Sequence, residues 1–140
     1  MTPTAVFSIA NLTAMPMWLL MIFLPKWKVT RFLIDFKIIP IALSVIYIIY
    51  IVQSILLGGQ MDFGSLPSVM ALFTQEHAVL AGWVHYLAFD LLVGMWILDN
   101  NKALGIHQLF IAPCLFLTFM FGPAGFLLFM IIKTIKNQTR

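Results

Sequence analysis

The stretch AVLAGWVHYLAFDLLVGMWIL, residues 78–98, decides how this chain folds. Apart from His85 and Asp90, it contains no side chain that is charged near neutral pH. About 20 consecutive apolar residues are enough for an α-helix to cross a bilayer. An aspartate near the centre of such a helix costs about 2.5–3.5 kcal/mol on insertion scales, so it needs a partner or a function. The segment is therefore a predicted membrane helix and the first place to look for function.

The composition of the whole chain points the same way. Its 140 residues are 62% hydrophobic and 9% charged, and the mean hydropathy is +1.02. Soluble domains contain about 25% charged residues, so this chain cannot build an aqueous surface. The long apolar runs lack the two-residue alternation of barrel strands, and helices satisfy their own backbone in lipid. The sequence predicts an all-α integral membrane protein, multi-pass, with one domain over residues 1–140.

Four apolar segments have the length of membrane spans and predict a compact four-helix bundle. They cover residues 4–24, 37–57, 76–98 and 106–132. Between the second and the third, Ser65 is placed to cap a short helix that Leu66-Pro67 opens and that reaches about Phe73. We expect this helix to lie at the interface, over the mouth of the bundle. The run 99–102, DNNK, predicts a turn after the third span.

The charged residues fit a lipid surface better than a nucleic acid. The net charge is +3, but the basic residues are few and flank the apolar segments, where they meet lipid headgroups. The loops at 25–37 and 99–105 carry more Lys and Arg than the tail at 133–140, so the positive-inside rule predicts both termini outside the cytoplasm. The first segment lacks the basic start and small-residue cleavage site of a signal peptide, so we expect it to be retained.

Neither a disulfide nor a metal centre is expected. Cys114 is the only cysteine, which excludes an internal disulfide and a cysteine-based zinc site. The remaining metal-binding side chains lack the paired spacing that places two ligands on one helix face. They are His77, His85, His107, Glu76 and Asp90. We predict no metal and no required cofactor.

A helical wheel separates the two polar residues of the third segment. Asp90 shares a stripe with Glu76 and Trp83, seven residues apart, with Tyr86 beside it. Tyr86 lies four residues before Asp90, so a bond from the phenol to the carboxylate is feasible. His85 falls on nearly the opposite face. Asp90 is thus either a polar contact that fixes helix register or a chemical group, and His85 either a core histidine bound to a carbonyl or a second chemical group.

The first and last segments add further polar marks. Asn11 and Trp18 share one stripe near Pro16, so the Asn11 amide either satisfies a carbonyl freed by the proline or reaches across to Asp90 or His85. In the last segment Thr118 lies on a face of small residues that includes Gly122 and Gly125. Such a face predicts close helix packing or, alternatively, a cleft for an elongated apolar ligand. Gly122-Pro123 predicts a kink.

Three stretches carry a family resemblance. They are NLTAMPMWLLMIFLPKWKVT at 11–30, WVHYLAFDLLVGMWI at 83–97 and PCLFLTFMFGPAGFLL at 113–128. In this order they resemble the abscisic-acid-deficient-four-like family, whose plant members are plastid membrane proteins required for neoxanthin synthesis. The resemblance implies a small four-helix membrane protein linked to xanthophyll chemistry, with a carotenoid as bound ligand.

In plants the reaction that the resemblance implies opens the 5,6-epoxide of violaxanthin and forms an allene, with no change in formula. It needs an acid at the epoxide oxygen and a base for a carbon-bound proton. On the residues that match the motifs, the resemblance implies Asp90 as base and His85 as acid. The same matching implies ligand contacts from Asn11, Trp18, Trp83, Tyr86, Thr118 and Phe121.

Three classes of function follow. The first is a carotenoid isomerase, and the second is a non-catalytic carotenoid- or lipid-binding protein, acting alone, as a homo-oligomer or as an accessory subunit of a larger membrane complex. The third is a transporter or proton relay, which the lack of an internal repeat disfavours. Because no transit peptide precedes the first segment, we expect a bacterial inner membrane or a photosynthetic membrane rather than an imported plastid protein.

Overall fold

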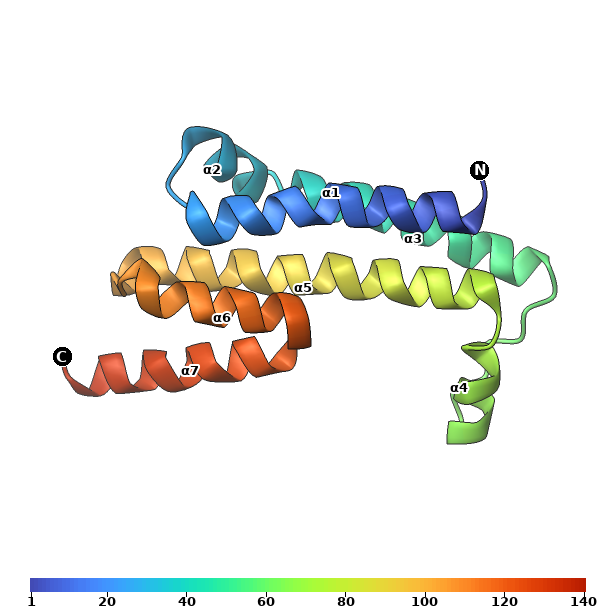
Figure 1. Cartoon of the computed structure of the whole chain (residues 1–140). Coiled ribbons are helices and arrows are strands. Elements are labelled where there is room, and N and C mark those ends of the chain that lie inside the picture. Colours follow the sequence, from blue (N-terminus) through green and yellow to red (C-terminus); the bar gives the residue numbers. More distant parts are fainter.

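The computed structural model describes all residues from Met1 to Arg140, which form seven α-helices and no strand (Figure 1). The helices are α1 (Pro3–Phe23), α2 (Lys28–Asp35), α3 (Ile38–Leu56), α4 (Leu66–Leu72), α5 (Glu76–Leu104), α6 (Gln108–Phe121) and α7 (Pro123–Gln138). The predicted all-α fold is confirmed.

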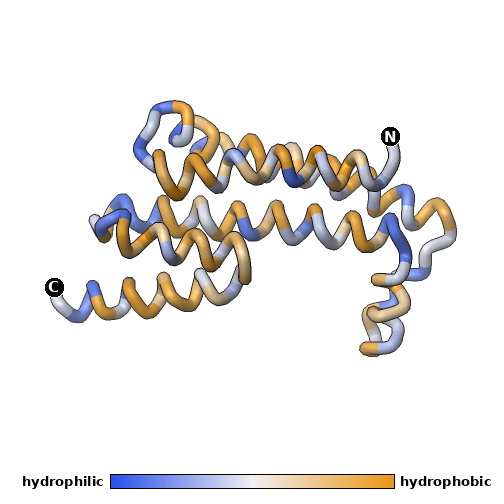
Figure 2. Tube along the Cα trace, in the orientation of Figure 1, coloured by the Kyte–Doolittle hydropathy of each residue, from blue (hydrophilic) through white to orange (hydrophobic).

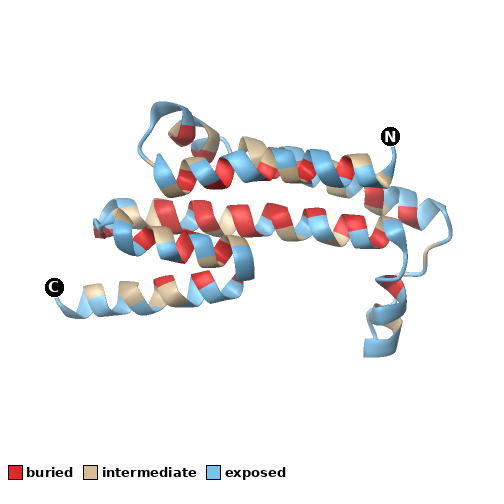
Figure 3. Cartoon of the chain, viewed as in Figure 1, coloured by how far each residue is buried: buried red, intermediate tan, exposed pale blue.

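Three of these helices, α1, α3 and α5, are long and apolar enough to cross a membrane. They contain 21, 19 and 29 residues and coincide with the first three predicted spans. Much of their apolar surface faces outward, and on α3 the exposed side chains include Ile41, Val45 and Ile48. Figures 2 and 3 show apolar helices whose outer surfaces are exposed while buried residues line the inner seams. This arrangement fits a protein surrounded by lipid rather than water.

The longest helix, α5, forms the centre of the molecule. It contacts α1 and α3 on one side and α6 and α7 on the other (Figure 1). Leu91 and Met95 of α5 are completely buried, and the Trp18 ring of α1 packs against Gly94. A Cβ at position 94 would stand 2.9 Å from that ring, so the glycine allows α1 and α5 to approach closely.

The predicted turn at 99–102 is wrong, because α5 continues through it to Leu104. Gly105 ends the helix in the left-handed region, at φ 63°. The Asn101 side chain then binds both backbone groups of Ile106, with its Oδ1 accepting from the N–H at 2.8 Å and its Nδ2 donating to the carbonyl at 2.9 Å. The polar run therefore caps and extends a helix instead of breaking it.

The structure does not show the fourth predicted span, because residues 106–132 form two helices instead of one. Gly122 adopts φ 44° and ψ −93°, and Pro123 begins a new helix that runs back antiparallel to α6 (Figure 1). The 14 residues of α6 rise about 21 Å, which is less than the roughly 30 Å of a bilayer core. The Gly-Pro pair thus produces a reversal, not a kink, and α6 and α7 form a helical hairpin beside α5.

This hairpin changes where the chain ends. Arg140 donates to the carbonyl of Ala103 at 3.3 Å, and the Lys133 ammonium donates to Asn100 Oδ1 at 3.1 Å. The C-terminus therefore lies at the end of the bundle that holds the α5–α6 loop, while the N-terminus lies at the other end (Figure 1). The two termini thus lie at opposite ends of the bundle, whereas the four predicted spans would bring them to the same end. All eight Lys and Arg residues lie on the elements that meet at the end with the C-terminus, the basic end, and they are Lys26, Lys28, Arg31, Lys37, Lys102, Lys133, Lys136 and Arg140.

The two short helices, α2 and α4, differ in how well the sequence predicts them. Helix α2, in the first basic loop, is not predicted by the sequence. Helix α4 is as predicted: the Ser65 hydroxyl accepts from the Ser68 N–H, and Pro67 lies in the first turn. However, α4 projects sideways from the end of the bundle and does not cover its mouth (Figure 1).

Candidate site at the hairpin turn

Asp90 lies in the interior, where α5 meets the turn between α6 and α7. It is 9% exposed, and its Oδ2 atom is buried without a hydrogen-bond partner. Its other carboxylate oxygen lies so close to Gly122 that a Cβ there would stand 2.8 Å away. Gly122 caps the N-terminus of α7 but offers no side chain to bind the free N–H groups of that helix. The carboxylate is thus placed near the positive end of the α7 dipole.

Tyr86 holds the same turn from one helical turn earlier in α5. Its hydroxyl donates to the carbonyls of Phe119 at 3.3 Å and Met120 at 3.2 Å. These carbonyls belong to the last turn of α6, where the helix break leaves acceptors without intrahelical partners. The phenol therefore satisfies backbone groups that would otherwise be orphaned in an apolar environment, and it fixes the hairpin against α5.

Trp83 extends this row of polar groups toward α1. Its indole N–H donates to Asn11 Oδ1 at 3.0 Å. The Trp83 ring lies 5.5 Å from the Tyr86 ring and 5.5 Å from that of Phe7, measured between centroids. The expectation that Asn11 reaches Asp90 or His85 is therefore wrong, because its contact with α5 is made through Trp83. Asn11, Trp83, Tyr86 and Asp90 form a row that runs from the contact of α1 with α5 to the hairpin turn, which we call the seam row.

An apolar groove adjoins the seam row at the end away from the basic residues. It has a volume of about 320 Å³ and ends at Trp83. Its lining consists of Pro3, Thr4, Phe7, Glu76, Val79, Leu80 and Trp83. Trp83 is 38% exposed, so one ring belongs both to the groove and to the seam row. An apolar ligand in this groove would lie next to Tyr86.

The other three predicted ligand contacts lie in different surroundings. Trp18 is 1% exposed and packs in the core, with its ring 5.5 Å from that of Phe119. Thr118 is buried, donates to the Cys114 carbonyl at 2.7 Å and contacts Gly125 of α7. Both residues hold helices together. Phe121 is exposed and ends α6 beside the turn, so it is open to a ligand in the bilayer.

His85 is not part of the seam row. It is exposed on the face of α5 toward α3, where its ring lies 5.6 Å from Tyr47 and 4.7 Å from Phe89. His85 and Asp90 lie on different faces of α5, which agrees with the separation that the helical wheel predicts. No group of three or more His, Cys, Asp or Glu side chains is placed to hold a metal ion.

Two features of the site could not be expected from the residues singled out in the sequence. The first is the pair of α6 carbonyls that bind Tyr86, because backbone acceptors leave no mark in a sequence. The second is the contact of Gly122 with Asp90. The signal for it was present in Gly122-Pro123, since a glycine followed by proline favours a helix end as well as a kink.

These features define a class of protein: all-helical, with three helices fit to cross a membrane and a buried acid at the turn of a hairpin. The ABA DEFICIENT 4-like family model matches residues 5–129, and the chain belongs to this family. The matched range includes the whole seam row and the hairpin turn.

A more distant comparison agrees. The chain is 21% identical over 142 residues to "Protein ABA DEFICIENT 4, chloroplastic" of Arabidopsis thaliana. The alignment covers 96% of this chain but 63% of that relative, so the chain spans less than two thirds of the relative's length. No solved structure matches the chain.

Proposed function

We propose that this protein binds a carotenoid or xanthophyll along the seam row and opens an epoxide on it by isomerisation. The family and its chloroplastic relative support a carotenoid-related role. The reaction and its residues are our inference from the site.

The observation that carries the proposal is the placement of Asp90. Burying a carboxylate is costly unless it is fully paired, and an acid inside a membrane helix is by default functional. Here the Oδ2 atom is buried with no partner, and the Tyr86 hydroxyl, one turn away, lies close enough to the carboxylate to share its proton between Asp90 and the α6 carbonyls. A residue that served only to fix helix register would be expected to have its hydrogen bonds filled. The free oxygen is suited to accept a proton.

A ligand that approaches from the bilayer has an apolar path as far as Trp83, whose ring lies beside that of Tyr86. The groove between α1 and α5 accepts the polyene, and the Phe7 and Trp83 rings provide the aromatic contacts that such chains favour. The end group of the ligand then reaches Tyr86 and the hairpin turn. Phe121 covers it from the lipid side.

In the proposed chemistry Asp90 removes a proton from the carbon chain. The electrons of that C–H bond form the new double bond of the allene as the epoxide C–O bond breaks. The epoxide oxygen takes a proton from the Tyr86 hydroxyl, which lies on the same face of α5, and Asp90 returns its proton to the phenolate. Acid and base are thereby restored, and the formula of the ligand does not change. We prefer Tyr86 to His85 as the acid because His85 faces α3.

We further propose a multi-pass arrangement in which α1, α3 and α5 cross the membrane and the α6–α7 hairpin enters it and returns. Non-helical backbone at the hairpin turn is tolerated there because Tyr86 and the packing of α5 cover it. The positive-inside rule places the basic end in the cytoplasm, or in the stroma of a photosynthetic organelle.

The binding claim is tested by pigment content. The protein is produced in a host that makes epoxy-xanthophylls, purified in mild detergent, and its absorption spectrum and extracted pigments are recorded. We expect stoichiometric carotenoid with the wild type and with His85→Gln, and loss of most pigment with Trp83→Ala. A colourless wild-type protein, or equal pigment in Trp83→Ala, would contradict the proposal.

A second function is favoured by the same burial. Because Asp90 is only 9% exposed, a ligand reaches it only if the hairpin turn moves. A non-catalytic carotenoid-binding protein, or an accessory subunit of a membrane complex, needs no such movement. In that case the bound pigment would be recovered without any change in its isomer composition.

A further inference from the structure

A second cavity lies at the basic end of the molecule, far from the seam row. It has a volume of about 860 Å³ and opens where the end of α1, the start of α2 and the α5–α6 loop meet. Its polar and charged lining consists of Lys26, Arg31, Asn101, Lys102, His107 and Gln108. No Asp or Glu lines it. The cavity is therefore a concave surface of one sign of charge.

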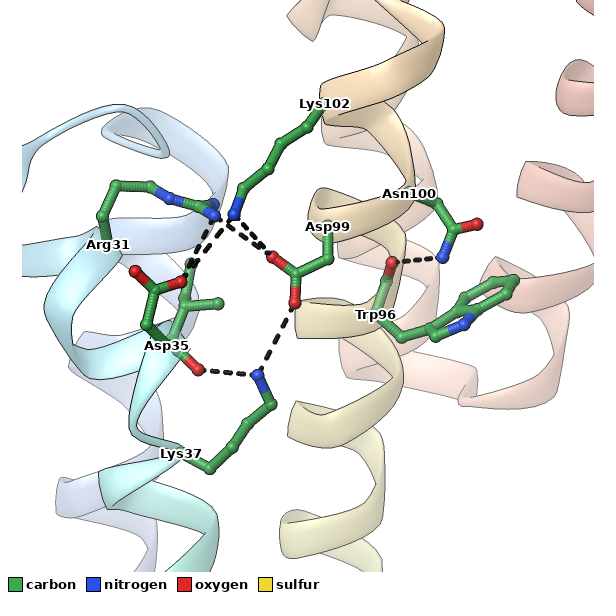
Figure 4. Close-up of polar contacts among 8 residues, drawn as sticks. Arg31, Asp35, Lys37, Trp96, Asp99, Asn100 and Lys102 are labelled. Carbon is green, nitrogen blue, oxygen red and sulfur yellow. Dashed lines mark hydrogen bonds and ion pairs between the residues drawn. The ribbon is translucent and has the colours of Figure 1, made fainter.

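Two carboxylates behind this lining hold two of its cations in place (Figure 4). The Arg31 guanidinium lies 3.1 Å from Asp99 and 3.6 Å from Asp35, and the Lys102 ammonium lies 3.2 Å from Asp99 and 3.8 Å from Asp35. Lys37 lies 3.6 Å from the same Asp99. Each carboxylate is thus shared by several cations, so their positive charge is only partly neutralised.

Lys26 and His107 complete the charged rim. Lys26 is exposed and makes no ion pair. The His107 Nδ1 atom accepts from the Leu109 N–H at 3.2 Å, so Nε2 is the nitrogen that remains to donate. A fixed guanidinium, two ammonium groups and an imidazole around one hollow match the oxygens of a phosphate or sulfate group.

The apolar border of the cavity indicates that the anion is attached to a lipid. Phe23 is 71% exposed, Leu24 51% and Trp27 50%, and all three line the opening. Trp at the end of a membrane helix lies at the level of the headgroups, and exposed apolar side chains beside it offer contact to acyl chains. Basic pockets between membrane helices on the cytoplasmic side are known to bind anionic headgroups.

We propose that this cavity binds the phosphate or sulfate headgroup of an anionic membrane lipid, with the acyl chains lying on Phe23 and Leu24. The site is separate from the seam row and does not depend on the function proposed for it. Its role would be to seat the basic end of the protein in a membrane leaflet rich in anionic lipid.

The test uses the purified, delipidated full chain in an uncharged detergent. Phosphatidylglycerol, phosphatidylcholine and inorganic phosphate are added separately at equal concentration, and the midpoint of thermal unfolding and the bound mass in native mass spectrometry are measured. We expect phosphatidylglycerol to bind and to raise the midpoint, and the other two to have little effect. Equal effects of the two lipids, or an equal effect of inorganic phosphate, would overturn the proposal.

Variants localise the site. Lys26→Gln is expected to weaken phosphatidylglycerol binding about fivefold, since one Lys near an anionic surface contributes about that factor. Lys136→Gln removes the same charge from α7, outside the cavity lining, and is the matched control. Because Lys26 is exposed and unpaired, its substitution leaves the fold intact. Equal weakening by the two variants would show a diffuse charge effect and overturn the assignment to this cavity.

Discussion

The carboxylate of Asp90 lies against the α-carbon of Gly122, so close that a side chain on residue 122 would force the carboxylate to move. The first added carbon would stand 2.8 Å from Asp90 Oδ1. Gly122 also has φ 44°, a conformation that other residues rarely adopt. One glycine therefore allows both the reversal of the chain and the approach of the acid. This pair of residues places the hairpin and the candidate site at the same point.

Gly122→Ala is expected to lower the free energy of unfolding by about 1–3 kcal/mol from backbone strain, and further from displacement of Asp90. Thermal or denaturant unfolding in detergent measures this. Gly105→Ala is the matched control, because Gly105 has φ 63° but open space around it. The loss should exceed that of the control, and it should shrink in an Asp90→Ala background. Equal losses at the two glycines would contradict the contact with Asp90.

Gly125→Ala is expected to separate α6 from α7. A Cβ at position 125 would collide with the Thr118 hydroxyl and with the backbone of Thr118 and Cys114. These are largely backbone atoms and cannot move aside, so a loss of more than about 2 kcal/mol is expected. Gly82→Ala is the control, since its Cβ would meet only the Phe73 side chain, at 3.0 Å. Unfolding midpoints that fall equally in the two variants would argue against the tight hairpin.

Asp99→Asn is expected to loosen α2 from α5. Asp99 faces Arg31, Lys37 and Lys102, which would then repel one another. Because the Asp99 side chain is 37% exposed, we expect a loss of about 1 kcal/mol or less. The difference from wild type should fall as salt rises from 0.05 to about 0.5 M. Asp62→Asn, in the exposed loop before α4, serves as control and should show neither effect.

The termini are expected on opposite sides of the membrane. Thr2→Cys and Thr139→Cys each place one exposed thiol at an end of the chain, while the natural Cys114 is buried and should not react. In sealed inverted vesicles, where the cytoplasmic side faces outward, a membrane-impermeant maleimide should label position 139 and not position 2. Labelling of both positions, or of neither, would contradict the hairpin, because a fourth span returns the C-terminus to the side of the N-terminus.

The parts of the fold that depend on local composition could be predicted from the sequence. The three long helices follow from runs of about 20 apolar residues, and α4 follows from the Ser65 cap and Pro67. The continuation of α5 past Asp99 could not be predicted, because it depends on cations of a distant loop and on the Asn101 cap. The sequence also does not show whether Gly122-Pro123 kinks the helix or reverses the chain, since the same two residues are compatible with both.

In the candidate site, too, the features within one helix could be predicted and the contacts between helices could not. The wheel places Asp90 and Tyr86 on one face and His85 on another, because the side chains of one helix have fixed relative directions. A helical wheel does not show which residues of other helices these side chains contact. The Trp83–Asn11 bond joins residues 72 positions apart, and the Tyr86 acceptors are backbone carbonyls. Trp18 and Thr118 matched the family motif as readily as Trp83, and only packing distinguishes them as core residues.

The most direct test of the central claim is turnover by single-site variants. An epoxy-xanthophyll such as violaxanthin is incubated with the purified protein in liposomes, and the pigments are separated and identified over time. We expect an allenic isomer with the wild type and with His85→Gln, formation slower by about a hundredfold or more with Asp90→Asn, and a comparable loss with Tyr86→Phe. Undiminished turnover by Asp90→Asn, or a loss confined to His85→Gln, would contradict the claim.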